Sequence, residues 1–208
     1  MDHSKKILVL RQLLLGHRYY NALRAMNYAQ AKHTGLRKDK VTPEFDHQLS
    51  MALYALTLPD VRYREELIAT IFLHDVREDY GISDEEIRAI FVGGDGFSAR
   101  VAGAVWRMTK KWRGIVRDTT ELFADMAQDE IASLAKGCDR IHNLQSMVGV
   151  FTAEKQTAYI AEAVERIIPM LKKARRNFPE QTLAYENIKW VIDSQIALIV
   201  ASLQALAS

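Results

Sequence analysis

Phe72-Leu73-His74-Asp75-Val76-Arg77-Glu78-Asp79 places an imidazole beside one carboxylate and a second pair of carboxylates within six residues. Apolar residues recur at helical spacing from Arg62 to Val76, so the stretch is predicted to end a helix and enter the following loop. On a continued helix, Glu78 would share a face with His74 and Asp75. One helical turn would then hold two candidate metal ligands and two acids that could transfer protons.

Helical periodicity continues along the chain on both sides of this stretch. Four prolines and ten glycines punctuate the 208 residues, and we find no alternating run of strand length. Thr42-Pro43-Glu44 has the order of an N-cap, an N1 proline and a first-turn acid, and Ser83–Glu86 is a capping box. We predict an all-α fold, an HD-type helical bundle of roughly eight to eleven helices. Helices are expected at 21–32, 42–56, 62–76, 83–93, 97–108, 119–127, 131–150, 153–173 and 182–207.

The composition favours a single globular domain over residues 1–208. With 49% apolar and 26% charged residues, disorder is excluded, and a net charge of +2 gives no support for nucleic-acid binding. The lone Cys138 excludes an intramolecular disulfide and suits a reducing compartment. We find no signal-peptide pattern, and the most apolar segment, Ile196–Ala207, is twelve residues long, too short to span a bilayer. We therefore expect a cytoplasmic protein without a membrane segment.

Two distant residues can complete a metal site around the opening stretch. His47 lies 27 residues before His74, and Asp139 lies 64 residues after Asp75. Two imidazoles and two carboxylates suit a borderline divalent ion such as Mn, Fe, Co, Ni or Zn. Such an ion would lower the pKa of a bound water and polarise a phosphoryl oxygen. A lone histidine or a single His-Asp pair is commonly structural, so the ordered set of four predicts the metal site.

The order His, His-Asp, Asp resembles the signature of the HD phosphohydrolase superfamily. Phe72–Asp79 is similar to the L-H-D-x-x-E-D motif of the RelA/SpoT-type hydrolase domain. Further matching segments are Ala31–Lys38, Pro43–His47, Cys138–Ser146 and Glu154-Lys155-Gln156. The likeness covers a motif-bearing core of about residues 21–171, with the predicted helix 182–207 beyond it. Members of that family remove the 3′-pyrophosphate from the alarmones ppGpp and pppGpp, commonly with manganese.

The resemblance implies a role for each matching residue. It implies that one divalent metal, most commonly Mn²⁺, is held by His47, His74, Asp75 and Asp139. It implies that Glu78 and Asp79 are the catalytic acids. A small nucleotide substrate would be bound by Arg37, Lys38, Asn143 and Ser146, with Arg37 suited to stacking on the base.

Some features depart from the family pattern. The loop between Arg37 and Pro43 is one residue longer than usual and lacks its glycine, and Tyr80 replaces the common threonine. No synthetase domain follows, so we expect a hydrolase-only alarmone enzyme, which could serve as an antitoxin to an alarmone-synthetase toxin. The alternatives are another HD-type nucleotide phosphohydrolase, for example one for deoxynucleotides, and a non-catalytic binding protein.

One basic and aromatic segment allows three interpretations. Trp106–Arg113, with Arg117, could be a solvated loop, a phosphate-binding segment or a surface for RNA such as a modified tRNA. We favour the first two and expect no nucleic-acid partner. Among the remaining histidines, we expect His142 to pack against or orient a ligand. His33 resembles a family position without a defined chemical role.

Overall fold

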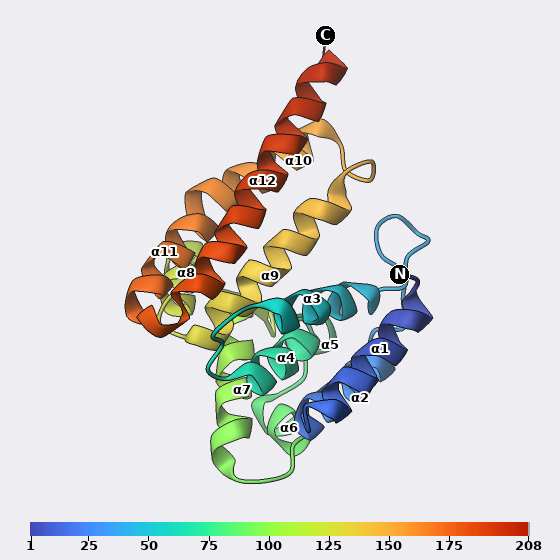
Figure 1. Cartoon of the computed structure of the whole chain (residues 1–208), viewed down its shortest axis with the longest axis vertical. Coiled ribbons are helices and arrows are strands. Elements are labelled where there is room, and N and C mark those ends of the chain that lie inside the picture. The colour runs from blue at the N-terminus through green and yellow to red at the C-terminus, as the bar shows by residue number, and fades with distance from the viewer. Residues whose placement is uncertain (208) are drawn as a thin grey trace.

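Residues 1–207, which the computed structural model describes, form twelve α-helices joined by short connections (Figure 1). The helices are α1 (His3–Gly16), α2 (Tyr20–Lys32), α3 (Asp46–Thr57), α4 (Arg64–Leu73), α5 (Val76–Tyr80), α6 (Asp84–Ala89), α7 (Asp95–Met108), α8 (Thr119–Met126), α9 (Glu130–Met147), α10 (Ala153–Glu162), α11 (Ile168–Asn177) and α12 (Thr182–Ala207). A π-helical turn, Ala163–Ile167, joins α10 to α11, and a 3-10 turn, Pro179–Gln181, precedes α12. The predicted all-α fold class is confirmed.

The twelve helices exceed the nine predicted ranges by three. Helices α1 and α5 were not predicted as separate helices, and the π-helical turn divides the predicted range 153–173 into α10 and α11. The only strands in the described residues, β1 (Lys111–Trp112) and β2 (Ile115–Val116), were not predicted. Both residues of their connection, Arg113 and Gly114, have positive φ, as a two-residue turn of type I′ requires.

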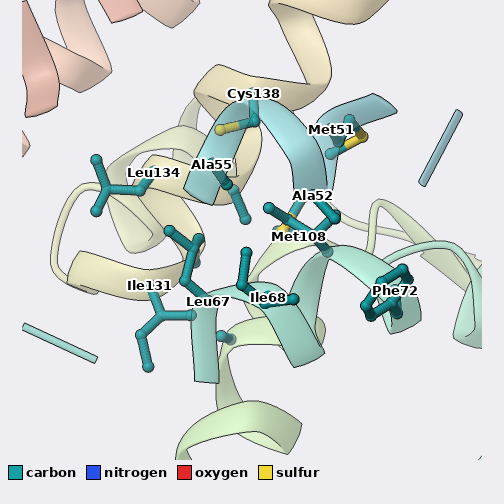
Figure 2. Close-up of a cluster of buried hydrophobic side chains, with 14 of the residues drawn as sticks. Met51, Ala52, Ala55, Leu67, Ile68, Phe72, Met108, Ile131, Leu134 and Cys138 are labelled. Atoms are coloured by element: carbon teal, nitrogen blue, oxygen red, sulfur yellow. The ribbon is translucent and has the colours of Figure 1, made fainter. Parts of the chain in front are cut away.

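Helix α4 lies at the centre of the bundle and explains where the acidic motif is placed. Its residues from Glu66 to Leu73 are all buried, because neighbouring helices α2, α3, α7 and α9 pack around it. Figure 2 shows Leu67, Ile68 and Phe72 of this helix against side chains of α3, α7 and α9. A helix that is apolar on all sides is stable only when it is enclosed in this way. Its end therefore delivers His74 into the interior of the bundle.

The motif itself does not continue the helix. The predicted helix 62–76 ends at Leu73, and α5 starts only at Val76, so His74 and Asp75 form the turn between them. The Asp79 N–H donates to the Asp75 carbonyl at 2.9 Å, which starts a new helical turn. His74 (φ −61°, ψ −33°) and Asp75 (φ −93°, ψ −14°) keep right-handed helical backbone angles, so the turn departs only slightly from a continued helix.

The last helix is longer than the apolar segment identified in the sequence. Helix α12 packs on α9 and buries Ile188 and Ile192, whereas Leu183, Trp190 and Leu198 on its other side are exposed. Its last turns project beyond the rest of the bundle (Figure 1). By length and composition, Pro179–Ala205 could cross a membrane, a criterion that core helices of soluble proteins also meet. The twelve-residue segment identified in the sequence is part of this longer apolar helix.

Candidate metal centre and active site

Segments far apart in the sequence converge on one cavity of about 530 Å³. They are the loop before α3, the start of α3, the turn between α4 and α5 together with α5, one face of α9, and the loop and helix α10 that follow it. A smaller cavity of about 130 Å³ adjoins it and shares Asp75, Glu78 and Lys136 as a common wall. His74 lines the smaller cavity. The other nine site residues predicted from the sequence line the larger one: Arg37, Lys38, His47, Asp75, Glu78, Asp79, Asp139, Asn143 and Ser146.

Three of the four predicted metal ligands form a tight group. His47, His74 and Asp75 each present one ligand atom, and these atoms lie within 4.8 Å of one another. The Nε2 atom of His74 is 3.0 Å from Asp75 Oδ2, and both imidazoles are buried. Nitrogen and oxygen ligands bind divalent metals at about 2.0–2.2 Å, so atoms on opposite sides of one ion are about 4 Å apart. The group therefore fits a single ion.

The Nδ1 atoms of His47 and His74 have hydrogen-bond partners, so the Nε2 atoms can serve as metal ligands. His74 Nδ1 donates to the Ile71 carbonyl at 2.8 Å. His47 Nδ1 lies 2.8 Å from His142 Nδ1, and burial lowers the pKa of His142 to about 3, so His142 is neutral and can accept. Such orientation of ligating imidazoles is the usual support of a metal site. The expected role of His142 is thus consistent with its position.

The charges in this group match a site for a cation. Burial opposes protonation of His74, but Asp75 more than compensates and raises the pKa of His74 to about 9. Burial alone would raise the pKa of Asp75, yet His74 lowers it to about 2. A proton on His74 thus balances the Asp75 carboxylate, and a divalent ion would replace that proton.

Asp139 joins the group through His47 rather than through all three ligands. Its Oδ1 atom is 3.2 Å from His47 Nε2 and accepts from the Asn143 amide at 2.6 Å. Its Oδ2 atom accepts from Lys136 Nζ at 2.7 Å. Although burial raises the pKa of Asp139, Lys136 and His47 hold it well below its usual range. Asp139 is therefore ionised and adjacent to the other three predicted ligands.

Sequence reasoning missed Lys136. It stands three residues before Asp139 on α9, so the two side chains lie on one helix face, a spacing that could have identified it.

The two predicted acids are in different environments. Glu78 Oε1 accepts from the N–H of Lys111, the first residue of β1, at 2.8 Å and also from the N–H of Lys110 just before it. Asp79 has carboxylates for neighbours. Burial first, and then the charges of Asp75, Glu44 and Glu78, raise the pKa of Asp79 to about 6.

The other end of the cavity is basic and aromatic. Arg37 Nη2 donates to Ser146 Oγ at 3.1 Å, which joins the loop before α3 to α9. Lys38 lies over the Phe151 ring, 5.1 Å from its centre. Phe151 and Tyr159 also line the cavity, although the sequence analysis did not single them out. The rim can therefore offer cationic groups to a nucleotide, whereas Lys38 and Lys155 lie over the Phe151 ring and Arg140 over the Tyr159 ring.

The tryptophans of the basic and aromatic segment are covered by the protein's own arginines. Arg77 lies 5.2 Å from the Trp106 ring and 5.3 Å from the Trp112 ring. Arg113 lies over Trp112 and Arg117 over Trp106. These contacts tie the hairpin to α5, next to Glu78, and occupy ring faces that a nucleic-acid base would need.

Comparison with known proteins gives relatives of one kind. No protein-family model matches the chain. A probable guanosine-3′,5′-bis(diphosphate) 3′-pyrophosphohydrolase of Synechocystis is 30% identical over 158 residues, 72% of this chain and 20% of the relative. The corresponding enzyme of Aquifex aeolicus is 29% identical over 71% of this chain and 20% of its own length. A GTP pyrophosphokinase of Brucella melitensis is 25% identical over 79% of this chain and 22% of its own.

These relatives are much longer proteins, and the chain spans about a fifth of their length. The similarity extends over most of the chain and includes curated proteins named for pyrophosphate hydrolysis and for pyrophosphate transfer. The resemblance found in the sequence motifs is thereby confirmed, and the chain is a homologue of the RelA/SpoT-type alarmone proteins.

Proposed function

We propose that the protein is a metal-dependent phosphohydrolase that removes the 3′-pyrophosphate of ppGpp and pppGpp. The observation that carries the proposal is the group His47, His74 and Asp75, which borders a cavity with Glu78 and Asp79 on its wall. The similarity to curated 3′-pyrophosphohydrolases supports the choice of substrate. The expected antitoxin role would depend on this activity and stays a prediction.

In this proposal, His47, His74, Asp75 and Asp139 hold one divalent ion, most commonly Mn²⁺. When bound, the ion activates water and neutralises charge on the phosphoryl oxygens. Lys136 keeps Asp139 ionised and in place, and the hydrogen bond from His74 to the Ile71 carbonyl keeps Nε2 directed to the ion.

The remaining residues orient the nucleotide and move protons. Arg37 and Lys38 bind the nucleotide at the cavity mouth, and Asn143 and Ser146 border it from α9. Water attacks the phosphorus that is bonded to the sugar 3′-oxygen, and that P–O bond breaks. Glu78 and Asp79 take the proton of the attacking water and return one to the leaving 3′-oxygen. The products are GDP or GTP and pyrophosphate.

Product analysis tests the proposal. Purified protein is incubated with ppGpp and Mn²⁺, with a metal-free control and with other ribo- and deoxynucleotides. We expect metal-dependent release of GDP and pyrophosphate, lost in Asp139→Asn and retained in the control Asp193→Asn on the exposed part of α12. Cleavage of another nucleotide instead of ppGpp would keep the metal site and reject the alarmone. No reaction with any nucleotide would favour a binding protein.

A further inference from the structure

A second group of potential ligands lies beside the first. His33 follows the end of α2, Glu44 lies in the loop before α3, and Asp79 lies on α5. One ligand atom of each side chain lies within 4.8 Å of the others. We propose that His33, Glu44 and Asp79 form a second divalent-cation site, which takes a borderline ion such as Mn²⁺ next to the ion held by His47, His74 and Asp75.

The environment of His33 prepares one ring nitrogen as a ligand. The side chain is fully buried, and burial lowers its pKa, so the imidazole is neutral. Its Nε2 atom lies 3.4 Å from the Gln48 amide, whose buried oxygen Oε1 has no hydrogen-bond partner. Because amide oxygen and nitrogen are assigned from their partners, the amide orientation with Oε1 toward His33 satisfies that oxygen. His33 then donates from Nε2, and Nδ1 carries the lone pair, with the Tyr80 hydroxyl 3.3 Å away.

His33 Nδ1 also faces a carboxylate oxygen of Glu44. His33 Nδ1 is 3.6 Å from Glu44 Oε1, longer than a direct hydrogen bond. The Tyr80 hydroxyl donates to the other oxygen, Glu44 Oε2, at 3.3 Å. Two acceptors that face each other repel unless a positive charge lies between them. Nitrogen and oxygen atoms 3.6 Å apart can both reach an ion at the usual distances of about 2.0–2.2 Å.

The surrounding charge also favours a second cation. Four carboxylates border this part of the cavity: Glu44, Asp75, Glu78 and Asp79. One ion at His47, His74 and Asp75 would offset part of that charge, and a second ion would offset the rest.

Two neighbouring ions could each stabilise a different oxygen during hydrolysis of the diphosphate. Paired divalent ions can stabilise the attacking and the leaving oxygens of one displacement. With Asp79 as a ligand, proton transfer to the leaving oxygen falls to Glu78. This role rests on the proposed function, whereas the site itself rests only on the three side chains.

Counting bound Mn²⁺ in the absence of nucleotide tests the site. Electron paramagnetic resonance measures free Mn²⁺ during a titration of the metal-free protein, and coupling between two bound ions changes the spectrum. We expect two ions per wild-type chain, with a coupled signal. Glu44→Gln should weaken the second site by at least about tenfold and abolish the coupling. The first ion should remain.

Control variants separate ligation from folding and from charge. Glu121→Gln on α8 makes the same change at an exposed position, and it should retain both ions. Tyr80→Phe removes a hydroxyl but no ligand, and it should also retain both. One ion per wild-type chain, or two coupled ions in Glu44→Gln, would overturn the proposal. Because no nucleotide is present, absence of ppGpp hydrolysis would reject the proposed function without affecting this result.

Discussion

The hydrogen bonds of Glu78 allow its two possible roles to be separated by two substitutions. Glu78→Gln keeps an oxygen that can accept from the Lys110 and Lys111 N–H groups, but it removes the carboxylate. Glu78→Ala removes both the carboxylate and the acceptor. If Glu78 transfers protons, Gln should lower kcat by about 10²–10⁴-fold, the usual size of an acid-base contribution. Alanine should cost at least as much.

The two variants should differ in stability. Two exposed hydrogen bonds contribute about 0.5 kcal/mol each, at the low end of the usual range, so Glu78→Ala should lose about 1 kcal/mol. For a chain of this size that lowers Tm by about 2–4 °C, whereas Gln should stay close to wild type. The assays are steady-state release of pyrophosphate from ppGpp, Mn²⁺ binding as a control for the metal site, and thermal unfolding. Near-wild-type kcat in Glu78→Gln, together with a large loss in Glu78→Ala, would refute proton transfer by Glu78 and leave it only the positioning of the hairpin.

Three further predictions concern the metal and the packing behind it. Asp139→Asn should lower Mn²⁺ affinity by at least about tenfold, measured by metal titration, because it removes a charged ligand; unchanged affinity would exclude Asp139 from the site. Mn²⁺ affinity should rise by up to about tenfold per pH unit as the pH increases toward 9. The reason is that the ion must displace the proton of His74, and the pKa of His74 is about 9. An affinity that does not change from pH 7 to 9 would contradict this prediction. Gly137→Ala should lower the free energy of unfolding, measured by chemical denaturation, by about 1–2 kcal/mol. The new Cβ would lie 2.7 Å from Ile188 Cγ2, and the cost of this clash outweighs the gain of about 0.5–1 kcal/mol from removing a helical glycine.

Local sequence signals predicted the helices well and the connections poorly. Capping residues and periodicity located α6 and α12, because those signals act within a few residues. No proline or glycine marks the end of α4 after Leu73. This helix end therefore could not be located from the sequence and is seen only in the structure. The β1–β2 hairpin was missed because two strands of two residues each are too short for a periodic pattern.

Some site residues could likewise be predicted from the sequence, whereas others could not. Ordered spacing identified His47, His74, Asp75 and Asp139 as a set. The contacts between Glu78 and the Lys110 and Lys111 amides span more than 30 positions, and no spacing rule predicts such pairs. The group of His33 and Glu44 depends on where the loop before α3 folds back, at the bridge between Leu36 and Pro43.

The buried carboxylates explain why this site is built for cations. An ionised carboxylate in the interior is stable only with a compensating charge or with several hydrogen bonds. Asp75 has the His74 proton, and Asp139 has Lys136 together with Asn143. The two arrangements respond differently to a metal. The proton on His74 is released when a metal binds, whereas Lys136 stays beside Asp139. Metal binding should therefore release a proton from His74, whereas Asp139 should share its oxygens between Lys136 and the ion. Lys136 thus keeps one ligand ionised and in position whether or not the metal is bound.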